Sequence, residues 1–382
     1  MNGKATKGDI RRHNRAMVLR AVYTGTATNR AALSVETELT KPAISDLVSA
    51  LINEGLLLEE GFGEVGEAGG KRPRLLRFLP NAAQVIGVAI HTYRVLGLLT
   101  TLDGDILVEH QAELTNQHPS EVFNTLIEVI HALLAQCDAP LLCISVGVSA
   151  LIDLNNGIVQ HAPRLGWFNW PLGAQLADRF SVPVYISNST ELATRAQIAY
   201  GGRAGVEHLA AVLVNNNIGV GSAHLPSGYH TGNDIGHLML GGNGQTLEEQ
   251  LGWSAVRERA LVLGRDHASP YLNDPMMTYL TVRYAAAMGD AAALALQREL
   301  SKTLAQIYTW VITLIRPDHL VLAGAIGNLG EPFLAQVIAE TQACIVPDLF
   351  QAVQFSIDDT DNLVALGAVA KALQEELGLI YG

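Results

Sequence analysis

The stretch from Thr28 to Gly70 constrains the fold of this chain most, because it predicts two short helices followed by a glycine-rich hairpin. Thr28 has the side chain of a helix N-cap and precedes a short helix with one apolar face. Thr40 precedes a second helix, whose apolar residues recur at helical spacing: Ile44, Leu47, Val48 and Leu51. Only residues 37–39 separate the two helices, which is the length of a helix-turn-helix connection.

The hairpin that follows predicts a winged helix-turn-helix. We expect strands at residues 56–60 and 74–79, joined by a loop that is rich in glycine and ends in a cationic run. The outer face of the second helix keeps small or polar side chains, as a helix lying in the major groove of DNA requires. We therefore expect the DNA contacts to come from these residues: Thr40, Lys41, Ala43, Ser45, Ser49, Lys71, Arg72 and Arg74.

The charge of the chain is unevenly distributed, and this supports a DNA-binding head. Residues 1–80 hold 12 Lys+Arg against 9 Asp+Glu, a balance of +3. The remaining residues hold 13 against 28, a balance of −15, which together give the net charge of −12. A large acidic body repels DNA, so contact is expected from the head alone.

Composition excludes several other classes of protein. At 382 residues the chain predicts two or three domains. No run approaches the ~18 apolar residues of a membrane span, and the first residues lack the apolar run of a signal peptide. The three cysteines, Cys137, Cys143 and Cys344, have no C-x-x-C spacing and predict neither disulfides nor a cysteine zinc site. We expect a protein of the reducing cytoplasm with no membrane partner.

The body after residue 80 predicts an α/β fold. Strands are expected at 84–91, 95–101 and 106–113, with a hairpin turn at Asp103-Gly104, and then a helix at 119–136, a strand at 141–148, a helix at 171–180 and a strand at 182–187. Three antiparallel strands followed by alternating helices and parallel strands are typical of a ribonuclease H-like lobe. Strands at 209–214 and 219–224 begin the plan again, followed by helices at 275–288 and 291–315, a strand at 318–323 and a helix from 331. Two such lobes form the actin-like architecture of sugar kinases.

We expect three structural units. A winged helix-turn-helix DNA-binding domain would occupy residues 1–80. The first lobe would contain residues 84–200 together with about 361–382, and the second lobe, for the effector and for oligomerisation, residues 201–360.

Short motifs along nearly the whole chain carry a resemblance to a known family. They are Leu39-Thr40-Lys41, Gly70-Lys71-Arg72-Pro73, Gly147 to Asp153, Ala162-Pro163, Leu165-Gly166-Trp167, Pro183-Val184 running into Asn188, Ile218-Gly219-Val220-Gly221, Ile235-Gly236-His237, and Arg316-Pro317-Asp318 leading to Gly324. In this order and spacing the chain resembles the ROK family (repressors, uncharacterised open reading frames and sugar kinases). It is most similar to the transcriptional-repressor branch, whose members are like the xylose and N-acetylglucosamine repressors.

The resemblance also shows which chemistry has been lost. In the family's kinases an Asn-Asp pair supplies the general base, whereas this chain has Asn188-Ser189, and a serine hydroxyl cannot take that proton at neutral pH. The phosphate loop with Asp, Gly and Thr is replaced by Ala89-Ile90-His91-Thr92. The family zinc is held by a histidine and three cysteines; His237 remains, but residues 238–248 contain no cysteine. We expect no enzymatic activity, no metal and no cofactor.

An effector pocket is the part of the body that the resemblance retains. Family sugar contacts map onto Asn188, Asp234, His237 and Glu248, whose amide, carboxylate and imidazole groups suit paired sugar hydroxyls. The alternative is a purely structural role, in which Asp234 and His237 only stabilise a loop.

The first hypothesis is thus a transcriptional regulator, a repressor of carbohydrate-metabolism genes, that binds a double-stranded DNA operator and senses a sugar or sugar phosphate as a homodimer or homotetramer. Two alternatives stay open: an active sugar kinase with a DNA-binding head, and a regulator controlled by a protein partner.

Overall fold

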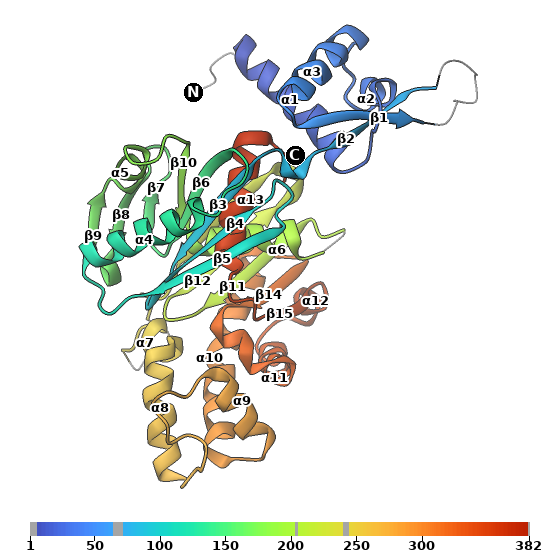
Figure 1. Cartoon of the computed structure of the whole chain (residues 1–382). Helices are drawn as coiled ribbons and strands as arrows, with labels where there is room; N and C mark the ends of the chain where they lie inside the picture. The colour runs from blue at the N-terminus through green and yellow to red at the C-terminus, as the bar shows by residue number, and fades with distance from the viewer. Residues whose placement is uncertain (1–5, 64–71, 203–204, 240–243, 381–382) are drawn as a thin grey trace.

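The computed structural model describes residues 6–63, 72–202, 205–239 and 244–380. Along the chain it forms a small head, a body of two sheets, and a helical end on the far side of the body (Figure 1). The head consists of α1 (Lys7–Tyr23), α2 (Arg30–Glu36), α3 (Lys41–Asn53), β1 (Leu57–Phe62) and β2 (Arg74–Phe78). The predicted winged helix-turn-helix is confirmed.

One helix start in the head differs from the prediction, and the other lies at the predicted residue. Asn29, rather than Thr28, caps α2, because its Oδ1 accepts hydrogen bonds from the amides of Ala31 and Ala32. Thr40 stands at the N-cap position of α3, but its hydroxyl makes no capping bond. Gly55 follows α3 with φ +77°, a left-handed conformation that glycine adopts without strain. It turns the chain into β1, which pairs antiparallel with β2.

The first lobe contains a five-stranded sheet in the order β10-β6-β3-β4-β5. Its elements are η1 (Pro80–Ala82), β3 (Gln84–Ile90), β4 (Arg94–Thr100), β5 (Ile106–Glu113), α4 (Pro119–Leu134), β6 (Leu141–Val148), β7 (Leu151–Asp153), β8 (Ile158–Ala162), η2 (Pro163–Leu165), β9 (Trp167–Trp170), α5 (Leu172–Ala177), β10 (Val184–Asn188) and α6 (Ser189–Tyr200). Strands β3, β4 and β5 are antiparallel, and β6 and β10 add in parallel, as predicted.

The second lobe repeats this plan with the order β13-β12-β11-β14-β15. Its elements are β11 (His208–Val214), β12 (Ile218–His224), η3 (Leu225–Ser227), β13 (Tyr229–Asp234), α7 (Leu247–Leu251), α8 (Trp253–Asp266), α9 (Tyr279–Ala287), α10 (Ala291–Ile315), β14 (His319–Ala323), η4 (Ala325–Leu329), α11 (Glu331–Gln342), α12 (Pro347–Gln351) and β15 (Gln354–Asp358). The chain then returns to the sheet of the first lobe with α13 (Leu363–Leu377). The helix predicted at 275–288 is shorter, since α9 begins at Tyr279. We propose that each five-stranded sheet and its helices form one lobe, with residues 84–200 and about 361–382 in the first lobe and residues 201–360 in the second.

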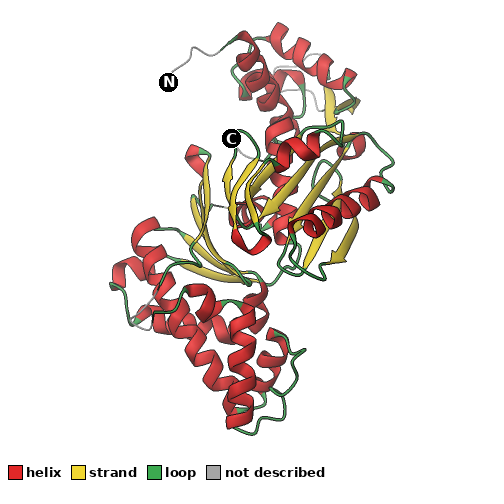
Figure 2. Cartoon of the chain, turned by 90° about the vertical axis from the view of Figure 1, so that its left-hand side faces the viewer, coloured by secondary structure: helices red, strands yellow, loops and turns green. Residues whose placement is uncertain are grey.

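Two helices, α6 and α13, lie between the sheets of the two lobes (Figure 2). They approach very closely because the chain places glycine at the contacts. A Cβ on Gly367 of α13 would lie 1.9 Å from the Leu192 carbonyl oxygen of α6. On Gly219 and Gly221 of β12, a Cβ would lie 2.0 and 1.9 Å from the hydroxyls of Thr190 and Thr194. These two glycines therefore allow α6 to pack directly against β12.

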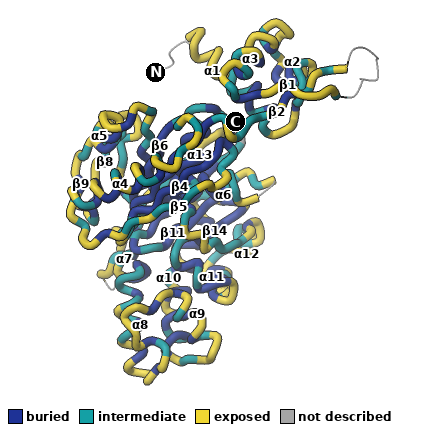
Figure 3. Tube along the Cα trace, in the orientation of Figure 1, coloured by how far each residue is buried: buried dark blue, intermediate teal, exposed yellow. Residues whose placement is uncertain are grey.

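The head and the body share one hydrophobic cluster. The head contributes Val18, Leu19, Val48 and Leu57 to this cluster. The body contributes the following residues: Val85, Cys143, Val369, Leu373, Leu377 and Leu379. Figure 3 shows the buried residues continuing from α13 toward the head. The C-terminal end of α13 is thus part of the core that supports the DNA-binding head. No helix within the described residues is long and apolar enough to cross a membrane.

Candidate functional site

The outer face of α3 presents most of the residues that we expect to touch DNA. Thr40, Lys41, Ser45 and Ser49 are exposed, whereas Ala43 is half-buried. The Ser49 hydroxyl donates to the Ser45 carbonyl oxygen at 2.7 Å, so the Ser49 side chain is fixed to the helix backbone. In the wing, Arg72 and Arg74 are exposed, and Lys71 lies outside the described residues.

Arg30 is a further cation at this face, and the sequence patterns did not reveal it. It is the first residue of α2, and its guanidinium reaches both α3 and β1. Its Nη1 donates to the Ser45 carbonyl oxygen at 3.0 Å, while its Nε and Nη2 donate to Glu59 Oε1 at 3.0 and 2.9 Å. Glu59 is 29 residues away in sequence, and no helical or strand periodicity links the two.

Arg72→Ala and Arg74→Ala are each expected to weaken binding to all DNA sequences, because wing arginines bind phosphates and not bases. The slope of log affinity against log salt concentration should become shallower by about 0.9 for each phosphate that is no longer neutralised. Fluorescence anisotropy over a salt series measures this slope. Arg298→Ala, which removes an exposed arginine on α10 far along the chain, is the charge-matched control. A slope that is equal in all three variants would place the wing away from the DNA backbone.

A cavity of about 840 Å³ lies at the junction of the two lobes, and the four residues expected to bind an effector all line it. Asn188 comes from the end of β10, Asp234 from the end of β13, His237 from the following turn, and Glu248 from α7. The volume lies within the range of about 300–1,000 Å³ that is usual for small-molecule sites. The structure therefore brings the predicted set together; whether a ligand binds there stays a prediction.

Asn188 is held rigidly at the edge of this cavity. Its Oδ1 caps α6 by accepting a hydrogen bond from the Thr190 amide at 2.8 Å, and its Nδ2 donates to the Ala150 carbonyl oxygen at 3.0 Å. Most of its hydrogen-bonding capacity is therefore used within the protein. Asn188 mainly positions the start of α6 and the groups beside it.

Asp234 is the residue best placed to meet a ligand. Its Oδ1 is buried and has no hydrogen-bond partner within the described residues. Burial and, to a smaller extent, the Glu248 carboxylate raise the pKa of Asp234 to about 6, against the opposing effects of a hydrogen bond from Asn188 and of the nearby His237. A buried carboxylate oxygen without a donor costs free energy, which a ligand hydroxyl would recover.

Glu248 is oriented by two residues that the sequence patterns did not identify. Its Oε2 accepts hydrogen bonds from Arg164 Nη2 at 2.5 Å and Nε at 3.1 Å, and its Oε1 accepts from Asn217 Nδ2 at 3.3 Å. Arg164 and Asn217 also line the cavity, as does Glu191, which pairs with Arg195 within α6 at 3.0 Å. Arg164 is 84 residues from Glu248, so only the fold brings this ion pair together.

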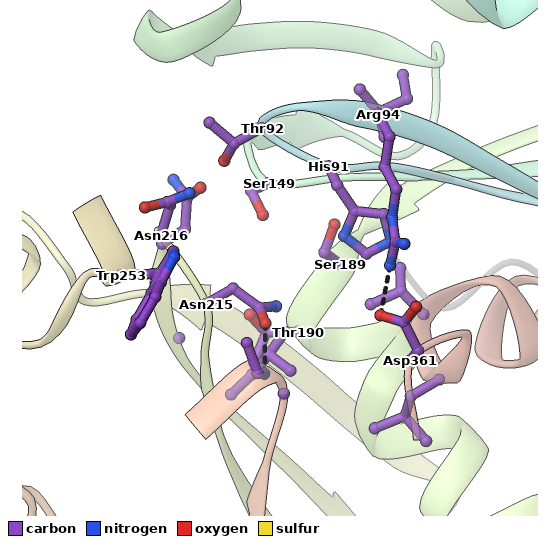
Figure 4. Close-up of a pocket in the computed structure, with 18 of the residues that line it drawn as sticks. His91, Thr92, Arg94, Ser149, Ser189, Thr190, Asn215, Asn216, Trp253 and Asp361 are labelled. Carbon is purple, nitrogen blue, oxygen red and sulfur yellow. Dashed lines mark hydrogen bonds and ion pairs between the residues drawn. The ribbon is translucent and has the colours of Figure 1, made fainter. Parts of the chain in front are cut away.

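A second, smaller cavity of about 240 Å³ adjoins the first, and Ser149 and Asn217 line both. Figure 4 shows His91 and Ser189 facing this space, with Arg94 paired to Asp361. Burial and, to a smaller extent, Arg94 lower the pKa of His91 to about 4, against the opposing effect of Asp361, so the imidazole is neutral at pH 7. Arg94 is therefore the only cation among the described residues that line this cavity. Ser189 is buried here and does not line the larger cavity.

Asp234→Asn is expected to raise the melting temperature more at pH 7.5 than at pH 5. A carboxyl whose pKa is higher in the folded state binds more protons there, so its contribution to stability is lost as pH rises from about 4 to about 6. The amide removes this penalty. Thermal unfolding at both pH values measures it, with Asp153→Asn as the control, because hydrogen bonds from Asn156 lower the pKa of that exposed carboxyl. An equal change at both pH values for Asp234→Asn would contradict the raised pKa.

Together, the head and the cleft define the class of protein: a winged helix-turn-helix joined to a two-lobed, actin-like sugar-kinase body. The chain belongs to the ROK family, whose model matches residues 85–375. Two curated relatives are a putative xylose repressor of Caldicellulosiruptor sp. (strain Rt8B.4) and the xylose repressor of Bacillus spizizenii. The first is 31% identical over 56% of this chain and 54% of its own length, so the matched part spans about half of that relative. The second is 24% identical over 97% of both chains.

Solved structures show the same fold. A ROK family transcriptional regulator described as a homologue of the E. coli MLC protein has a TM-score of 0.82 at 19% identity, covering 96% of this chain and 98% of its own. A ROK glucokinase from Streptomyces griseus, in complex with glucose and AMPPNP, has a TM-score of 0.66 at 16% identity, covering 76% and 100%. The resemblance to the regulator extends over the head as well as the body.

Proposed function

We propose that this protein is a DNA-binding transcriptional repressor of carbohydrate-metabolism genes, and that its kinase-like body binds a sugar or sugar phosphate as effector. The observation that carries the proposal is the physical connection between the two sites. Leu363 and Val364, at the start of α13, line the smaller cavity, while Leu373 and Leu377, near its end, lie in the core of the head. Helix α6, which begins beside Asn188, packs along the same α13.

This arrangement can couple sugar binding to DNA binding. A sugar changes the DNA-binding equilibrium only through its different affinity for two states of the protein. A shift of α6 and α13 that closes the cavity would displace the end of α13 under the head. The DNA contacts are proposed as above, and the effector contacts as Asn188, Asp234, His237 and Glu248 together with Arg164.

Catalysis is not part of the proposal. A kinase needs a general base and cations that neutralise the transferred phosphate. Ser189 stands at the base position, and Arg94, the cation of the smaller cavity, is paired with Asp361. We also propose a cytoplasmic homodimer or homotetramer, because one helix-turn-helix covers a single half-site and a two-fold axis supplies the second.

The test is a selection of DNA from a random-sequence pool by the full-length protein, followed by titration of the bound complex with sugars. Xylose and N-acetylglucosamine are the first candidates, as xylose repressors are among the relatives and an N-acetylglucosamine repressor of E. coli is 23% identical to this chain. The expected result is a preferred duplex with two related half-sites, released by one sugar. Light scattering should report a dimer or tetramer.

Phosphorylation of any hexose or pentose with ATP, abolished by mutation of cleft residues, would favour the kinase alternative. A complex that no sugar or sugar phosphate releases would favour control by a protein partner.

A further inference from the structure

Glu59 lies where three parts of the DNA-binding head meet. It stands on β1, the first strand of the wing, and its side chain is 24% exposed. Its Oε1 accepts two hydrogen bonds from Arg30 of α2, at 3.0 and 2.9 Å. Its Oε2 lies 3.7 Å from Nη1 of Arg74, on β2. One carboxylate therefore binds two arginines that come from both sides of the proposed DNA surface.

Arg30 extends this network to the recognition helix. The guanidinium that binds Glu59 also donates through Nη1 to the Ser45 carbonyl oxygen at 3.0 Å and to the Ser45 hydroxyl at 3.2 Å. Ser45 lies on the exposed face of α3. A guanidinium has a rigid planar fork of donors, so fixing one edge on Glu59 also fixes the edge that holds Ser45. Glu59 is thus connected to α3 through Arg30.

We propose that Glu59 determines how well the head distinguishes its operator from unrelated DNA. Glu59 holds Arg30 on Ser45, and it competes with backbone phosphates for Arg30. Phosphate contacts supply most of the affinity for unrelated DNA, so arginines that are already paired lower that affinity. On the operator, base contacts made by a correctly oriented α3 compensate for this reduction. The inference rests on the proposed DNA-binding function.

The neighbouring residue provides a matched control. Glu60 also pairs with a wing arginine, since its Oε1 lies 2.6 Å from Nε of Arg77. Successive side chains of a strand point to opposite faces, so Glu60 is directed away from Glu59. Among its described hydrogen bonds and ion pairs, Glu60 has none to α2 or α3. Glu59→Gln and Glu60→Gln therefore remove the same charge, but only the first releases Arg30.

The experiment compares the full-length wild-type protein with both variants by fluorescence anisotropy. The two probes are the duplex that the wild type selects from a random pool and poly(dI-dC), each over a salt range of about 50–200 mM. Glu59→Gln is expected to bind poly(dI-dC) more tightly, with a salt slope steeper by about 0.9 for each arginine that binds a further phosphate. Its preference for the selected duplex should fall about tenfold, which corresponds to the removal of one base-specific hydrogen-bonded pair. Glu60→Gln should keep the wild-type preference.

A second variant distinguishes the effect of the positive charge of Arg30 from the effect of its hydrogen-bond geometry. It also tests the inference if the Glu59→Gln protein does not fold. Arg30→Lys keeps the positive charge but lacks the fork that joins Glu59 to Ser45. It should lower the preference for the selected duplex without steepening the salt slope. An unchanged preference in Arg30→Lys, or equal reductions in Glu59→Gln and Glu60→Gln, would overturn the inference. A wild-type protein that retains no DNA at all would overturn the proposed function and this inference with it.

Discussion

Asp234→Asn and His237→Ala are expected to leave operator binding unchanged and to remove the response to the sugar. Both residues line the cavity between the lobes, whereas the head, which we propose binds the operator, is formed by a separate part of the chain. Each hydrogen bond to a charged group that the variant cannot make should cost about 1.5–3 kcal/mol. The half-maximal sugar concentration should therefore rise by about tenfold or more. The measurement is a titration of sugar against the preformed protein–operator complex.

Asp348→Asn is the matched control for this experiment. It makes the same acid-to-amide change at an exposed position on α12, outside the cavity. The control should release DNA at the same sugar concentration as the wild type. If Asp234→Asn and His237→Ala also do so, the effector binds elsewhere. Because Glu248 is already paired with Arg164, Asp234 is the more informative carboxylate to change.

Gly367→Ala is expected to lower the free energy of unfolding by about 3 kcal/mol, near the upper end for overpacking of a core. The added methyl group would meet a backbone carbonyl oxygen, that of Leu192, at 1.9 Å, and a backbone atom cannot rotate away as a side chain can. Helices α6 and α13 would have to separate, which disturbs the two sheets that cover them. Urea unfolding followed by circular dichroism measures the change in stability.

Gly8→Ala is the control, because Gly8 is also helical but has open space around it. The nearest atom to an added Cβ there is the Thr6 hydroxyl at 3.6 Å. Alanine should stabilise this position by roughly 0.5–1 kcal/mol through its better helix propensity. A Gly367→Ala protein as stable as the wild type would show that α6 and α13 do not cross so closely. Since the same helices connect the cavity to the head, Gly367→Ala should also weaken the sugar response.

Local sequence patterns determined the secondary structure where one face of an element is buried and the other exposed. The apolar spacing from Ile44 to Leu51 predicted α3, and Asp103-Gly104 predicted the turn between β4 and β5. The small sheet β7-β8-β9 and the strand β15 were not predicted, because these strands have three to five residues and no clear alternation of burial. Short elements of this kind are stabilised by their neighbours and carry little pattern of their own.

The sequence by itself determined the fold class, the family and four of the residues that line the larger cavity, because each of these depends on local motifs in a fixed order. Only the tertiary structure decided which groups act on one another. Arg164 forms an ion pair with Glu248, and Arg30 binds Glu59 and Ser45. These partners are too far apart in the sequence for any helical or strand periodicity to link them. The tertiary structure also showed that Gly219 and Gly221 allow α6 to pack against β12, and that α13 extends from the smaller cavity to the head. The physical reason is that ion pairs and close helix contacts depend on distances in space, which the order of residues along the chain does not specify.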